Sequence, residues 1–269
     1  MEPGKDHRDR ILTGVVGLII VFLVVGCDSK SIFFGFILLI NLLALNEFYG
    51  LVSISRNTRW LGMVWGIGLT AGFFYFKHAI FFGLISAIIF LICIFRILTF
   101  RQPEPSSSGF KKHLTGSFIV FFLSHLIWLR GLSDGHLWIF FLLSVAFCGD
   151  TFAFYGGKLF GKHKLSVKIS PGKTVEGAIL GLLGSVGMGY FFAILFFPKF
   201  TSFRIIFLTS ILGVICQLGD LWESVLKREA KVKDSGKLLP GHGGILDRVD
   251  SLFFSTPFLY YFLQFQVCS

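Results

Sequence analysis

The residues best suited to chemistry lie near the end of the chain, in a polar stretch between apolar segments. It holds Asp220, Glu223, Ser224-Val225-Leu226-Lys227-Arg228, Lys233-Asp234 and Pro240-Gly241-His242-Gly243-Gly244-Ile245-Leu246-Asp247-Arg248-Val249-Asp250. Carboxylate oxygens are the hard ligands that divalent cations prefer. Cationic side chains and nearby backbone N–H groups bind phosphate oxygens. The stretch therefore predicts a site that grips a metal ion and a polyphosphate.

The spacing of the acidic residues favours a functional site. Asp220, Glu223 and Lys227 fall on one helix face if the helix continues, and Asp247 and Asp250 are likewise three residues apart. An acidic side chain at the centre of a membrane span costs about 2.5–3.5 kcal/mol, so its presence calls for a reason. The alternative is structural: Asp250 caps a helix, and Asp220 reaches interfacial water.

A second polar segment, residues 155–176, follows Asp150-Thr151 and is rich in lysine and glycine. Its triplet Gly172-Lys173-Thr174 suggests a P-loop, but that motif needs glycine where Val167 stands and a preceding strand. What is left is a basic segment suited to phosphate binding. The alternative is that its lysines are ordinary positive charge on a cytoplasmic loop.

The elements that must position these residues are apolar helices. Hydrophobic residues make up 54% of the 269 positions and charged residues only 15%, below the roughly 25% charged of soluble domains. Because about 20 apolar residues cross a bilayer, we expect an all-α, polytopic membrane protein with about nine transmembrane helices. They lie near residues 11–26, 32–49, 61–76, 79–98, 117–133, 137–154, 177–197, 204–221 and 251–267.

The net charge of +10 is explained by orientation in the membrane, not by a nucleic-acid partner. Lysine and arginine gather in alternate loops, which predicts a cytoplasmic N-terminus, an odd number of spans and an outside C-terminus. The segments 155–176 and 222–250 then share the cytoplasmic face. A linker at 101–116, rich in proline and serine, separates the N-terminal helices (1–100) from a C-terminal catalytic region (117–269).

Other ionisable residues in the spans are weaker candidates. Glu47, near the end of the second span, is expected either to orient a partner or to lie at the interface. His125 and Arg130 in the fifth span are expected to be packing or interface groups.

The run from Ser224 to Asp250 resembles the motif of the phosphatidate cytidylyltransferases, also called CDP-diacylglycerol synthases. Upstream, Asp150-Thr151, Gly161-Lys162-His163-Lys164-Leu165 and Lys173-Thr174-x-Glu176-Gly177 resemble that family too, as does Asn46-Glu47-Phe48-Tyr49 in the first half. Two positions depart from the pattern: Phe152 stands where glycine is expected, and Gly172 stands where lysine is usual.

The resemblance implies that CTP and phosphatidate react to give CDP-diacylglycerol and pyrophosphate, for phospholipid synthesis. It implies Mg²⁺, with a second cation left open, and a multi-pass protein of the inner (cytoplasmic) membrane whose active site faces the cytoplasm. A homodimer is left open. The phosphatidate oxygen is already ionised at pH 7, so the reaction needs mainly positioning and charge neutralisation.

Roles follow from the resemblance residue by residue. Asp220 and Asp247 are the predicted metal ligands, assisted by Asp250. The predicted groups that neutralise or orient phosphates are Lys227, Arg228, His242 and Arg248, and the glycines whose amides approach a phosphate are Gly243 and Gly244. The other predicted substrate-binding residues are Asp150, Lys162, His163, Ser170, Lys173, Thr174, Glu176, Glu223, Ser224 and Lys233.

Three other functions compete with this reaction. A CTP-dependent lipid kinase of the polyprenol type would release CDP and leave no cytidine on the lipid. A cytidylyltransferase could act on a different lipid phosphate. An anion transporter would spread its ionisable groups through the spans at midplane depth, whereas here they cluster at one face.

Overall fold

The computed structural model describes residues 3–76, 78–100, 109–198, 200, 202–232, 234–236, 238 and 243–267, with side chains from residue 12 to residue 265. The chain is almost entirely helical. Its long helices are α1 (Pro3–Gly26), α2 (Lys30–Leu51), α3 (Arg56–Tyr75), α4 (Ala79–Thr99), α5 (Gly109–Arg130), α6 (Gly135–Phe160), α7 (Val175–Phe196), α8 (Ser202–Glu229) and α10 (Leu252–Val267). A single turn, α9 (Leu246–Val249), precedes α10, and a hairpin of β1 (Lys164–Ser166) and β2 (Ser170–Thr174) joins α6 to α7.

The prediction of an all-helical, polytopic membrane protein is confirmed. Within the described residues, six helices are long and apolar enough to cross a bilayer: α2, α4, α5, α6, α7 and α8. Each of the nine predicted segments overlaps one long helix. That α1, α3 and α10 also cross the membrane stays a prediction, as does the orientation of the N-terminus.

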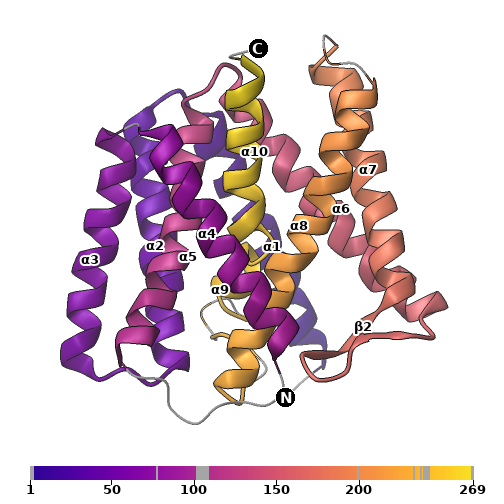
Figure 1. Ribbon diagram of the computed structural model, residues 1–269. Coiled ribbons are helices and arrows are strands. Elements are labelled where there is room, and N and C mark those ends of the chain that lie inside the picture. Colours follow the sequence, from indigo (N-terminus) through magenta and orange to yellow (C-terminus); the bar gives the residue numbers. More distant parts are fainter. Residues whose placement is uncertain are drawn as a thin grey trace.

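The helices run side by side, with α6, α7 and α8 on one side of the bundle and α2 and α3 on the other (Figure 1). Helix α5 packs against α2, α3 and α10, and α10 packs against α8, so these two helices connect the sides. The predicted linker is shorter than expected, because α5 already begins at Gly109. Residues 101–108 of that linker lie outside the described residues.

Buried polar side chains cross-link the helices of the first half. Asn41 of α2 is fully buried and donates hydrogen bonds of 3.0 Å to Thr70 of α3 and Ser124 of α5. His125 of α5 lies 3.3 Å from the Ser86 hydroxyl and 3.1 Å from the Tyr261 hydroxyl. These bonds connect the helices and give partners to the Asn41 amide nitrogen and the His125 ring, while the Asn41 Oδ1 has no partner among the described residues. His125 is therefore a packing group, as expected.

Helices α6 and α7 approach closely through small residues spaced four apart. An added Cβ at Gly181 of α7 would lie only 2.9 Å from the carbonyl oxygen of Gly149 of α6. Four residues further along α7, Ser185 donates a 3.1 Å hydrogen bond to the carbonyl of Val145. Small residues at this spacing let two helix backbones pack in contact. The β1–β2 hairpin lies between these two helices in the chain and contacts both of them.

Candidate active site

Three carboxylates meet where α8 passes the start of α10. Oxygen atoms of Asp220, Glu223 and Asp250 all lie within 4.8 Å of one another. Glu223 has no exposed surface, and its Oε1 accepts no hydrogen bond from the described residues. A buried carboxylate oxygen without a donor, beside two further carboxylates, fits the oxygen-ligand chemistry of a divalent cation.

Asp250 reaches this group because Gly219 lets the backbones of α8 and the α9–α10 turn touch. An added Cβ at Gly219 would lie 2.4 Å from the Asp250 carbonyl oxygen. Burial, and then the negative charges of Asp220 and Asp150, raise the pKa of Asp250 well above its ordinary value. A bound cation would remove this repulsion, which supports the fit of a metal to the three carboxylates.

Asp247 lies next to this group but has different partners. Its Oδ1 accepts a 2.8 Å hydrogen bond from Lys227. Its Oδ2 accepts bonds from the Ser235 amide at 3.0 Å, the Ser235 hydroxyl at 2.7 Å and the Gly244 amide at 2.9 Å. Burial alone would raise the pKa of Asp247, but the bonds from Lys227, Gly244 and Ser235 outweigh burial and hold the pKa well below its ordinary value.

Lys227 joins the two sets of carboxylates. Its ammonium lies 2.5 Å from Glu223 Oε2 and 2.8 Å from Asp247 Oδ1. The structure therefore groups Glu223, which the sequence placed among the substrate-binding residues, with Asp220 and Asp250. It places Asp247, a predicted metal ligand, among hydrogen-bond donors of the loop after α8.

Glu47 brings the first half of the chain into the site. Its Oε2 accepts a 2.9 Å hydrogen bond from the Leu246 amide and a 3.4 Å bond from the Ser235 hydroxyl. An added Cβ at Gly244 would lie 2.4 Å from Glu47 Oε2, so only glycine fits beside this carboxylate. Of the two roles expected for Glu47, the structure favours orienting a partner, and the partner is the Asp247 loop.

The glycines of the motif shape this loop. Gly243 has a φ of +81°, a left-handed conformation that glycine adopts without strain. The Gly244 amide, predicted to approach a phosphate, donates to Asp247. His242 and Lys233, two predicted site residues, lie outside the described residues.

The β1–β2 hairpin closes the site from the α6–α7 side. Lys173 of β2 forms a 2.5 Å ion pair with Asp220. Arg228 at the end of α8 donates a 2.9 Å hydrogen bond to the carbonyl of Ile169, which is buried. Asp150 lies within electrostatic range of Asp220, Lys173 and Arg248. The two polar segments therefore lie together, which fits their expected place on the same face.

Several predicted substrate-binding residues hold the hairpin in place. Glu176 accepts hydrogen bonds from the amides of Lys162 at 3.0 Å and His163 at 3.2 Å, and from the His163 ring at 2.6 Å. Thr174 caps α7 by accepting a 3.1 Å bond from the Gly177 amide. Ser170 is half-buried in β2, whereas Ser224 is buried in α8.

The two residues that depart from the family pattern, Phe152 and Gly172, have different surroundings. Phe152 packs on α7, where an added Cβ at Gly184 would lie 2.7 Å from the Phe152 ring. Gly172 is exposed on the hairpin, and an added Cβ there would meet nothing within 4 Å.

Comparison with known proteins identifies the family of this chain. The model of the "Cytidylyltransferase family" matches residues 8–266. A phosphatidate cytidylyltransferase of Bacillus subtilis (strain 168) is 35% identical over 269 residues, which are 96% of this chain and 98% of the relative. An Escherichia coli (strain K12) protein named "Uncharacterized protein YnbB" is 34% identical over 93% of this chain and 85% of the relative.

A shorter match is more similar. A phosphatidate cytidylyltransferase of Staphylococcus haemolyticus (strain JCSC1435) is 48% identical over 129 residues, which are 47% of this chain and 49% of the relative. The family model covers nearly the whole length of the chain, and two relatives at more than 30% identity do the same. The chain belongs to the cytidylyltransferase family.

Proposed function

We propose that this protein transfers the cytidylyl group of CTP to phosphatidate, giving CDP-diacylglycerol and pyrophosphate. The observation that carries the proposal is the group formed by Asp220, Glu223 and Asp250, joined through Lys227 to Asp247. Relatives named phosphatidate cytidylyltransferase support the choice of lipid substrate.

The reaction needs charge neutralisation more than proton transfer. An ionised oxygen of the lipid phosphate attacks the α-phosphorus of CTP, and the bond to the β-phosphate breaks as pyrophosphate leaves. No strong general base is required, so catalysis consists of in-line positioning and stabilisation of negative charge. Asp220, Glu223 and Asp250 would hold a divalent cation, proposed as Mg²⁺, which supplies positive charge for phosphate oxygens.

In this proposal the lysine and arginine side chains neutralise the negative charge of the phosphates. Lys227 is fixed by Glu223 and Asp247, and Lys173 by Asp220, so both ammonium groups are pre-positioned. Arg228 is held by the hairpin through Ile169. Arg248 is exposed beside them and is proposed to contact phosphate. Preorganised charges of this kind need no rearrangement during the reaction.

We further propose that the protein crosses the inner membrane nine times, with its N-terminus and active site in the cytoplasm. The distribution of lysine and arginine supports this orientation. The marked chain ends lie at opposite ends of the bundle, which agrees with an odd number of spans (Figure 1). CTP would then reach the site from the cytoplasm, and the lipid from the adjacent leaflet.

The test is reconstitution of the purified chain with phosphatidate, radiolabelled CTP and Mg²⁺. We expect a cytidine-labelled lipid and release of pyrophosphate. No labelled lipid, under conditions where a family enzyme is active, would contradict the proposal. Release of CDP without cytidine on the lipid would identify a CTP-dependent lipid kinase instead, and activity restricted to another lipid phosphate would change the substrate.

A further inference from the structure

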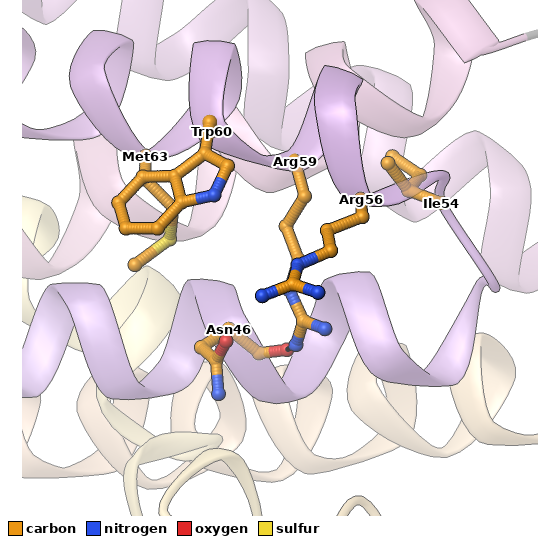
Figure 2. A pocket seen from close by; sticks show the side chains of 6 residues that line it. All are labelled: Asn46, Ile54, Arg56, Arg59, Trp60 and Met63. Carbon is orange, nitrogen blue, oxygen red and sulfur yellow. Dashed lines mark hydrogen bonds between the residues drawn. The ribbon is translucent and has the colours of Figure 1, made fainter.

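A cavity that none of the catalytic residues lines lies at the corner where α2 ends and α3 begins. Its volume is about 370 Å³, and its lining residues are Asn46, Ile54, Arg56, Arg59, Trp60 and Met63. The side chains of Arg56 and Arg59 both extend from α3 toward Asn46 of α2 (Figure 2). Two guanidinium groups that converge in one cavity suit an anion with several oxygens, because each guanidinium presents a fork of N–H donors.

Arg56 and Arg59 bring two positive charges to this cavity. Neither Arg56 nor Arg59 has an ion pair among the described residues. Arg59 donates to the carbonyl oxygen of Asn46, but its buried Nε has no hydrogen-bond partner there. A buried donor left without an acceptor costs roughly 1–3 kcal/mol. An anion in the cavity would supply the missing acceptor.

The surface beside the cavity is suited to lipid. Four apolar side chains of α3 are exposed on the chain, each by more than 60%: Trp60, Leu61, Val64 and Trp65. Tryptophan is enriched where the hydrocarbon of a membrane meets its polar headgroups. The corner therefore offers positive charge at the start of α3 and an apolar surface along the helix, which matches a phosphate group attached to acyl chains.

The corner also adjoins the active-site loop. A second cavity, of about 480 Å³, shares Asn46 and Arg59 with the first and is lined as well by Glu47, Ser235 and Gly236. Glu47 and Ser235 are the residues that contact the Asp247 loop. A lipid headgroup in the first cavity would thus lie next to the loop that carries Asp247.

We propose that this corner binds the phosphate headgroup of an anionic phospholipid, with Arg56 and Arg59 on the phosphate and Trp60 beside the start of the acyl chains. The occupant is defined by a negative phosphate joined to hydrocarbon. The proposal concerns lipid binding, goes beyond the transferase reaction and does not depend on turnover.

The test is native mass spectrometry of the full chain in detergent, titrated with dioleoyl phosphatidylglycerol or, separately, dioleoyl phosphatidylcholine. Phosphatidylglycerol is anionic and is not the proposed substrate, so the result is independent of the transferase assay. We expect the anionic lipid to bind at least tenfold more tightly than the zwitterionic one. We expect the Arg56→Gln/Arg59→Gln variant to lose most of this preference.

A matched control removes the same charge elsewhere. Lys30 and Arg204 are exposed at the starts of α2 and α8, whereas the cavity lies where α2 ends. The Lys30→Gln/Arg204→Gln variant should therefore keep the preference for the anionic lipid. Equal losses in the two double variants, or equal binding of the two lipids, would overturn the proposal. Displacement of phosphatidylglycerol by an equal concentration of glycerol phosphate would also overturn it, because the site would then recognise a soluble anion.

A single variant distinguishes loss of lipid binding from misfolding of the protein. Arg56 is exposed and its side chain makes no hydrogen bond to the described residues, so Arg56→Gln should leave the apparent melting temperature unchanged. We expect this variant to bind phosphatidylglycerol at least threefold more weakly. Unchanged affinity in Arg56→Gln would contradict the assignment of Arg56 to the phosphate.

Discussion

The carboxylates on the two sides of Lys227 differ in their hydrogen-bond partners. Asp247 accepts bonds from Lys227, Ser235 and Gly244, so both of its oxygens are occupied by donors. Glu223, by contrast, is completely buried and meets only Lys227 at one oxygen, while its other oxygen has no donor among the described residues. A carboxylate surrounded by donors stabilises a loop, whereas one that lacks them is suited to a cation.

This difference changes the roles expected for Asp247 and Glu223. The sequence places Asp247 among the metal ligands and Glu223 among the substrate-binding residues. The contacts favour the reverse assignment, in which Glu223 joins Asp220 and Asp250 around the cation and Asp247 holds Lys227 and the loop. The predictions below test this reversal.

The largest effect is expected from Glu223→Gln. Loss of a cation ligand should lower cytidylyl transfer by at least ~10²-fold, the scale of losing one preorganised electrostatic contact. Thermal unfolding gives an independent readout: saturating Mg²⁺ should stabilise the wild type, by about 2.7 kcal/mol at 100 times its Kd. It should not stabilise the variant.

Glu229→Gln is the matched control, since Glu229 lies six residues further along α8 and pairs with Arg96. It should keep both activity and the Mg²⁺-dependent stabilisation. A Glu223→Gln enzyme with a normal Mg²⁺ requirement would remove Glu223 from the cation site.

Asp247→Asn should also abolish most turnover, but by a different route. The variant releases Lys227 and loses a charge-assisted bond, which costs roughly 1.5–3 kcal/mol of stability. We expect the Mg²⁺ concentration for half-maximal activity, measured on the residual rate, to stay within about twofold of wild type. A shift as large as that of Glu223→Gln would instead make Asp247 a metal ligand, as the sequence predicts.

A smaller effect is expected at Glu47, which supports the Asp247 loop from α2. Glu47→Ala leaves the Leu246 amide without its acceptor, a loss of about 1–3 kcal/mol that should lower the apparent melting temperature and the rate together. Glu47→Gln keeps an amide oxygen at that place and should recover most of the activity. Equal loss in both variants would show that the charge of Glu47, not its position, matters.

The smallest effect is expected at Gly172, where the chain departs from the lysine usual in the family. An added side chain meets open space, so Gly172→Lys should change stability by less than ~0.5 kcal/mol. The added charge beside the site should lower KM for CTP modestly at low salt, with kcat unchanged. A KM that does not respond to salt would show that position 172 is remote from the nucleotide.

The helices were predictable from the sequence for a clear reason. A bilayer requires long apolar segments with every backbone group bonded internally, so hydropathy alone marks most of them. The close packing of α6 and α7 was not predicted, although glycine and other small residues spaced four apart along α7 are a signal of close helix packing. The sequence could not predict that α6 is the helix packed against them, because the same spacing fits any neighbouring helix with small residues.

The sequence predicted which charged residues make up the candidate site, but not which of them contact one another. The acidic and basic residues of the segments 155–176 and 222–250 were identified from their types, and the family that their motif resembles is the one whose model matches the chain. Their spacing suggested that Asp247 and Asp250 act together. The structure gives them different partners: Asp250 lies with Asp220 and Glu223, whereas Asp247 accepts hydrogen bonds from Lys227, Ser235 and Gly244.

The sequence by itself determined the helices, the membrane setting, the family and the set of charged residues, since each depends on residue type and on local spacing. Only the tertiary structure decided which carboxylates lie together as a candidate cation site. Glu47 and Asp247 meet at Ser235 although Glu47 is 188 residues away from that serine. Contacts across such distances depend on how helices pack, and close approach at Gly219 and Gly244 decides which oxygens meet donors and which are left for a cation.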